Sequence, residues 1–126
     1  MSRFVKPEVV RIDLTNGDWI LVRRQLTAGE LRRVFARTAK PVLTGQPIEV
    51  DLEKAGISEM VAYLVDWSFT DEQGKPVAIK DMPAEYVLDV LNNLDGASFA
   101  EIYQAIQVHE ASIADEKKTP SGATVS

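Results

Sequence analysis

The stretch DLTNGDWILV, residues 13–22, places an Asn-Gly pair between two runs of alternating apolar residues. Asn-Gly is the preferred central pair of a type I′ turn, because both central positions of that turn need a positive φ. We therefore predict a β-hairpin over residues 9–24 with Asn16 and Gly17 as its two-residue loop. A lone hairpin is only marginally stable in water, so its apolar face must pack on helices.

The predicted register gives this hairpin one core face and one mixed face. The residues expected on the core face are Val10, Ile12, Leu14, Trp19 and Leu21. Ile20 and Val22 then share the opposite face with Arg24, because side chains alternate along a strand. These residues are available to a partner molecule unless a later strand or helix covers Ile20 and Val22.

Four helices are predicted after the hairpin from capping signals and from apolar residues at helical spacing. Thr27 and Glu30 form a capping box at the start of the first helix, and Ser98 and Glu101 form a second box at the start of the last. Gly56 is expected to interrupt the chain before the second helix. The helices are expected at about residues 28–40, 58–69, 83–94 and 99–114.

These elements predict one α+β domain, mostly α, over residues 1–114: an N-terminal β-hairpin packed on about four helices. The chain has 126 residues, of which 45% are hydrophobic and 26% charged, enough to build one core. The last twelve residues, DEKKTPSGATVS (115–126), are polar and small. We predict that they form a disordered, flexible C-terminal tail.

The net charge of -5 hides a division along the chain. Residues 1–40 contain nine lysines and arginines against four acids, and residues 41–126 contain five lysines against fifteen acids. Such a split is consistent with head-to-tail self-association into a homo-oligomer, or with a partner that touches one end. It is equally consistent with two solvated faces that attract each other within one monomer.

The sequence offers little that bond-making chemistry needs. There is no cysteine, so a thiolate nucleophile, a thiolate metal site and a disulfide framework are excluded. The single histidine, His109, falls on the apolar stripe of the last helix, where a packing or interface role is expected. No phosphate-binding or nucleophile motif occurs. We predict no enzymatic activity, no cofactor and no metal.

The sequence argues against membrane association and leaves nucleic-acid binding as an alternative. No stretch approaches the roughly 20 apolar residues of a membrane helix, so we expect no membrane association and a cytosolic location. A basic cluster could follow a phosphate backbone: Arg23, Arg24, Arg32, Arg33, Arg37 and Lys40. The acidic chain and the lack of aromatic residues among these arginines argue against nucleic acid, which stays the alternative outside protein binding.

The order of features resembles the small tail assembly chaperones of long-tailed bacteriophages and prophages. The likeness runs over about residues 13–113, through GDW, LTAGELRRVFAR, YLVDWSFTDEQGKPV and SFAEIYQAIQVHE. Its most telling part is LVDWSFTDEQGKPV, in which an aromatic-rich segment runs into a turn containing acidic, Gly, Lys and Pro residues.

This resemblance implies a non-enzymatic role in the host cytoplasm. Such chaperones bind the long helical tape-measure protein and help to recruit the tail-tube protein during assembly. The alternative among viral proteins is a structural head–tail or tail component of the particle.

From the residues we expect partner binding at Ile20, Val22, Arg24, Arg33 and Arg37.

Overall fold

The computed structural model describes residues 3–40, 49–50 and 52–118. In chain order the elements are β1 (Val9–Asp13), the 3₁₀ turn η1 (Thr15–Gly17), β2 (Trp19–Arg23), α1 (Ala28–Thr38), β3 (Ala39–Lys40), β4 (Glu49–Val50), α2 (Leu52–Tyr63), β5 (Leu64–Trp67), α3 (Ala84–Asn92) and α4 (Gly96–Lys118). The predicted class, α+β and mostly α, is confirmed. Of the predicted tail, residues 115–118 continue α4, and residues 119–126 lie outside the described residues.

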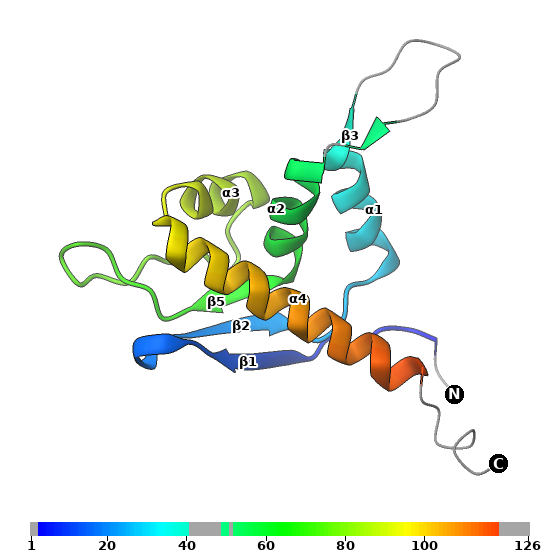
Figure 1. Cartoon of the computed structure of the whole chain (residues 1–126), viewed down its shortest axis with the longest axis horizontal. Coiled ribbons are helices and arrows are strands. Elements are labelled where there is room, and N and C mark those ends of the chain that lie inside the picture. The colour runs from blue at the N-terminus through cyan, green and yellow to red at the C-terminus, as the bar shows by residue number, and fades with distance from the viewer. Residues whose placement is uncertain (1–2, 41–48, 51, 119–126) are drawn as a thin grey trace.

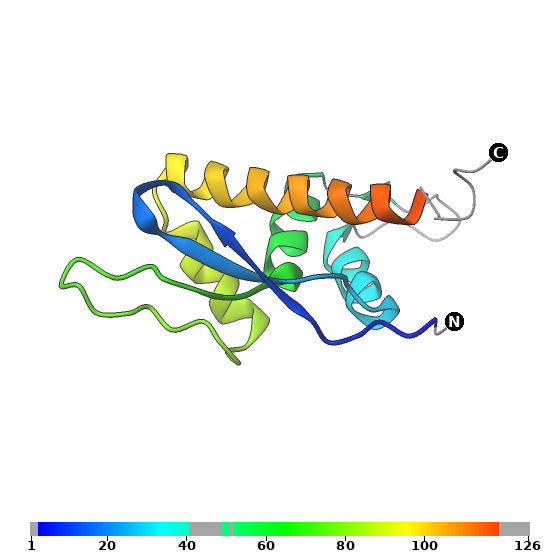
Figure 2. The same cartoon turned by 90° about the horizontal axis from the view of Figure 1, so that it is seen from below.

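A small sheet and three short helices lie beside the long last helix. β1, β2 and β5 form an antiparallel sheet in the order β1-β2-β5, and β3 and β4 pair separately. α4 runs across the sheet, while α3, α2 and α1 stand side by side with α2 in the middle (Figures 1 and 2). The N-terminal hairpin therefore packs on helices, as predicted.

The hairpin has a longer loop than the predicted two residues. Asn16 and Gly17 do adopt positive φ values, 59° and 79°. They lie, however, within a 3₁₀ turn that begins at Thr15. The backbone N–H and the hydroxyl of Thr15 both donate to the Glu101 carboxylate of α4, at 2.9 and 3.1 Å. The turn is therefore held by a contact with a helix far away in the sequence.

The longer loop changes the register and exchanges the two faces of β2. Ile20 pairs with Ile12, and Val22 pairs with Val10. A change of one residue turns every side chain of a strand to the other face. Ile20 and Val22 are 0% exposed in the core, so the prediction that they lie on a mixed outer face is wrong.

The predicted second helix, 58–69, is a helix followed by a strand. α2 begins earlier, at Leu52, and ends at Tyr63, after which β5 pairs antiparallel with β2. Leu64 and Trp67 of β5 are both buried although they lie three residues apart, because the register of the strand pair shifts between them. Buried residues three apart have the spacing of a helix, so apolar periodicity alone cannot separate the two structures here.

α2 continues through Gly56, contrary to the predicted interruption. A Cβ atom built at position 56 would lie 2.8 Å from Cε2 of Tyr103 on α4, closer than real Cβ atoms approach other groups. The missing side chain therefore allows α2 and α4 to approach each other. Gly56 serves helix packing and does not end the helix.

The two helix starts that the sequence predicts turn out differently. The capping box of α1 is confirmed: the Thr27 N–H donates to Glu30 Oε1 at 2.8 Å, and the Glu30 N–H donates to Thr27 Oγ1 at 3.1 Å. The start of α4 was predicted wrongly. Asp95 is the capping residue, since its carboxylate accepts from the Ser98 N–H and hydroxyl at 2.8 Å each, and these bonds lower the pKa of Asp95. Glu101 is thereby free to hold Thr15.

The core fills the space between the sheet and the helices α2, α3 and α4. Its buried hydrophobic residues, among those described, are Ile20, Val22, Leu26, Met60, Val61, Tyr63, Leu64, Trp67, Ile79, Val87, Leu91, Ile102 and Ile106. The predicted apolar stripe of the last helix is confirmed by the burial of Ile102 and Ile106.

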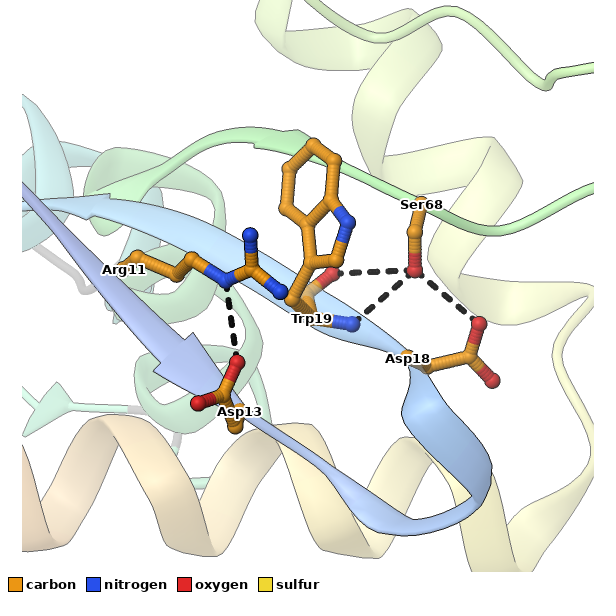
Figure 3. A network of polar contacts seen from close by, with 5 residues as sticks. All are labelled: Arg11, Asp13, Asp18, Trp19 and Ser68. Carbon is orange, nitrogen blue, oxygen red and sulfur yellow. Dashed lines mark hydrogen bonds and ion pairs between the residues drawn. The ribbon is translucent and has the colours of Figure 1, made fainter.

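Polar contacts fasten the loop end of the hairpin to the residue after β5 (Figure 3). The Ser68 hydroxyl accepts from the Trp19 N–H and donates to Asp18 Oδ1, both at 2.9 Å. On the same outer face Arg11 forms an ion pair with Asp13 at 2.9 Å, and its guanidinium carbon lies 5.3 Å from the centroid of the Trp19 ring. Trp19, predicted to point into the core, thus packs on the outer side of the sheet.

Candidate functional site

Residues of α1, α2 and α3 line a trough, with α2 along its floor and α1 and α3 along its walls. Figure 1 shows α2 lying between the other two helices. It consists of two adjoining pockets, of about 200 and about 710 Å³, which share Arg37, Val61 and Ala84. We call this surface the α1–α3 trough. The residues that define it below are Arg33, Arg37, Ile57, Val61, Met82, Glu85, Leu88 and Asp89.

The α1 wall of the trough is basic. Arg33 and Arg37 lie four residues apart and so point to the same side of the helix. Both are exposed, and neither has an ion-pair partner within residues 3–40, 49–50 and 52–118. Two like charges at this spacing repel each other. The wall therefore favours an anionic group placed between or beside the two guanidinium groups.

The α3 wall is acidic. Glu85 and Asp89 also lie four residues apart, both are exposed, and in the described part of the chain neither forms an ion pair. Glu85 lies in the first turn of α3, where a negative charge interacts favourably with the helix dipole. Asp81 adds a third carboxylate just before this helix and has a φ of 61°, a value that Asp tolerates better than most residues. The acidic wall faces the basic one across the trough.

The floor between the walls is apolar. Ile57 and Val61 of α2 lie one turn apart, and Leu88 of α3 lines the same pocket as both. Met82, just before α3, lines the smaller pocket and is 41% exposed. Covering apolar surface contributes roughly 25 cal/mol per Å², so an apolar occupant of this floor is favoured over water.

The structure brings together only two of the five predicted partner-binding residues. Arg33 and Arg37 line the trough. Ile20 and Val22 are core residues and cannot meet a partner. Arg24 is held elsewhere, because its Nη2 lies 2.9 Å from Glu116 Oε2 near the end of α4 and its Nε lies 3.8 Å from a carboxylate oxygen of Glu8.

The basic cluster of the sequence is likewise divided. Arg23 forms an ion pair with Glu30 at 2.9 Å, and its Nη1 donates to the Ala62 carbonyl at 2.7 Å. These bonds connect β2, α1 and the end of α2 at one end of the trough. Arg33 and Arg37 face an acidic wall, an arrangement less favourable to a polyanion than an open basic face.

His109 is a packing residue, as its position on the apolar stripe predicts. It is buried, and its ring meets the ring of Tyr63 edge-on with centroids 5.9 Å apart. Its Nε2 lies 3.1 Å from the Arg23 carbonyl oxygen and 3.0 Å from that of Arg24. Carbonyl oxygens only accept hydrogen bonds, so Nε2 carries a proton and donates it. The histidine therefore fastens α4 to the end of β2.

A carboxyl pair lies between α2 and α4. Burial raises the pKa of Glu59 from 4.5 to about 7, and a hydrogen bond to Glu110 and the negative charge of Glu110 act in the same direction. Gln107 donates to Glu59 Oε1 at 2.9 Å. Burial and the same two carboxylates raise the pKa of Tyr63 to about 12. The raised pKa of Glu59 thus reflects its burial and the nearby Glu110 carboxyl group at the contact between two helices.

Sequence reasoning missed the acidic half of the trough and its floor. The spacing of Glu85 and Asp89 on the predicted third helix was a usable signal, since it places both carboxylates on one side. Which helix they face follows only from the tertiary packing. Met82 stood in a stretch that the sequence presents as a helix start and gave no sign of a binding role.

Comparisons with known proteins found no significant match. No model of a protein family, no curated protein and no solved structure matches the chain significantly. Within the described residues, no three carboxylate or imidazole side chains are grouped so that they could hold a metal ion. None of the helices in that part of the chain is both long and apolar enough to cross a membrane.

Proposed function

We propose that this protein is a tail assembly chaperone of a long-tailed phage or prophage, acting in the host cytoplasm. In this role it binds helical segments of the tape-measure protein and helps to bring tail-tube subunits to it. The resemblance over residues 13–113 supports the identity of the partner. The observation that carries the proposal is the α1–α3 trough, an apolar channel between charged walls.

The trough has the properties that holding an amphipathic rod requires. A helix that lays its apolar stripe into a groove is a common mode of peptide recognition. Ile57 and Leu88, which are partly exposed, supply apolar contact, while the exposed arginines and carboxylates keep the empty trough hydrated. A long rod presents many similar segments, so weak binding at each is multiplied along its length.

The test is co-expression with the tape-measure protein encoded by the same genome. We expect that the partner stays in the soluble fraction only when this chain is present. Met82→Glu places a charge in the apolar lining of the smaller pocket. Val108→Glu is the matched control, because Val108 is an apolar residue of α4 that is 63% exposed and lies outside the trough.

We expect Met82→Glu to lower the soluble fraction of the partner severalfold and Val108→Glu to leave it unchanged. Equal solubility of the tape-measure protein with and without this chain contradicts the proposal. So does mass spectrometry of purified particles that finds this chain in stoichiometric amounts, because an assembly chaperone is released and a structural component remains.

A further inference from the structure

The two walls of the α1–α3 trough carry opposite charges that do not neutralise each other. In the part of the chain that the structure describes, no ion pair of 4.0 Å or less joins Arg33 or Arg37 to Glu85 or Asp89. All four side chains are exposed along the rims of the apolar floor. The trough thus presents a basic rim, an apolar floor and an acidic rim, in that order.

The length of the trough limits what it can hold. α3 has nine residues, which corresponds to about 13 Å of helix. An occupying helix laid alongside it contacts the trough over roughly two turns, with apolar residues at i, i+3 or i+4, and i+7. Its two flanks then lie over the rims, one above α1 and one above α3.

Resting on the proposed function, we propose that the trough takes an amphipathic helix whose apolar stripe is bordered by acidic residues on one side and basic residues on the other, and that the two rims fix the direction in which this helix runs. Turning a helix end for end with its stripe kept on the floor exchanges its two flanks. Only one of the two directions places acidic residues over Arg33 and Arg37 and basic residues over Glu85 and Asp89.

The rims act on orientation more than on affinity. Exposed ion pairs each contribute little, whereas like charges placed opposite one another are unfavourable, so the correct and the reversed direction differ by the sum of several small effects. An apolar floor by itself holds a helix equally well in either direction. Directional binding would let successive copies of this protein bind a long helical partner in the same orientation.

Two designed helical peptides of the same composition test this inference. Both carry the same leucine stripe; one has glutamates on the left flank and lysines on the right, and the other has the flanks exchanged. The chain contains no cysteine, so a single introduced cysteine provides the only labelling site. Asn93→Cys places it next to Asn92 of the larger pocket, and Lys80→Cys places it next to Asp81 of the smaller pocket. A fluorophore at the peptide N-terminus and a quencher on that cysteine report the direction of binding.

We expect both peptides to bind with equal affinity and in opposite directions: one is quenched by the label at position 93 and the other by the label at position 80. A quadruple variant that exchanges the charges of the two rims should reverse both results. Its substitutions are Arg33→Glu, Arg37→Glu, Glu85→Lys and Asp89→Lys. A peptide with glutamates on both flanks should bind about tenfold more weakly at low ionic strength, and less than threefold more weakly at high salt, because salt screens exposed charges.

The outcomes separate this inference from the proposed function. If both peptides bind in the same direction, or each in a mixture of directions, the rims do not set orientation, although the trough still binds helices. If neither peptide binds and co-expression also fails, the proposed function itself is wrong. Salt-sensitive binding of labelled DNA that is lost in Arg33→Glu with Arg37→Glu would assign the basic rim to nucleic acid and overturn the inference.

Discussion

At the scale of single residues, the carboxyl pair between α2 and α4 predicts a dependence of stability on pH. The pKa of Glu59 is about 7 in the folded chain and 4.5 in the absence of its neighbours. Between these values the folded chain binds more protons than the unfolded one, so the free energy of unfolding falls as the pH rises. The contribution is complete below about pH 4.5 and is lost as the pH passes 7. Its size is about 1 kcal/mol once partial solvent exposure is allowed for.

Glu59→Gln should remove most of this slope and make the protein more stable at pH 8. The amide still accepts from Gln107 and can still donate to Glu110, but it carries no charge. Urea unfolding at pH 5 and pH 8 measures the effect. Glu72→Gln, in an exposed turn, serves as the control and should leave the slope as it is. An unchanged slope in Glu59→Gln would show that other groups cause the dependence.

Gly56 allows a second prediction at this scale. Replacing a glycine inside a helix by alanine ordinarily gains about 1 kcal/mol. Here the new Cβ meets the ring of Tyr103 at 2.8 Å, so we expect Gly56→Ala to gain nothing or to destabilise the chain. In a Tyr103→Ala background the ordinary gain should return. A double-mutant cycle of unfolding free energies measures this coupling, and additive effects of the two changes would refute it.

At the scale of elements, the capping box of α1 orients the basic wall of the trough. Thr27→Ala removes the oxygen that accepts from the Glu30 N–H and should cost about 1 kcal/mol of stability. Thr27→Ser keeps that oxygen and should lower the free energy of unfolding by at most a few tenths of a kcal/mol. Chemical unfolding of both variants, with circular dichroism as the readout, checks the difference. Equal losses in the two variants would mean that the methyl group of Thr27 matters and the cap does not.

The elements also show where reasoning from sequence succeeds. α1 was predicted closely, because Thr27 and Glu30 signal its start within four residues of chain. β5 was missed, because a strand of four residues is specified by its pairing with β2 and by a register shift that gives it helical spacing. The hairpin register failed for a related reason, since the contact of Thr15 with Glu101 spans most of the chain.

At the scale of the whole molecule, the trough is the feature that the sequence could not give. The sequence predicted Arg33 and Arg37 as partner-binding residues, and their spacing was enough to place them on one side of a helix. Their acidic counterparts, Glu85 and Asp89, lie about fifty positions further along. They become the opposite wall only because α1 and α3 both pack beside α2 (Figure 1).

Because the trough joins helices from distant parts of the chain, an occupant should stabilise both walls at once. A ligand present at 100 times its Kd raises the free energy of unfolding by about 2.7 kcal/mol. Either of the two designed helical peptides should therefore slow hydrogen exchange of the amides in α1 and in α3, including those amides that exchange through local opening. The amides of β1, on the far edge of the sheet, should keep their local exchange rates. Exchange measured by mass spectrometry with and without peptide makes the comparison, and Met82→Glu should abolish the protection. Protection confined to one wall would mean that the peptide lies on a single helix and that the trough does not act as one site.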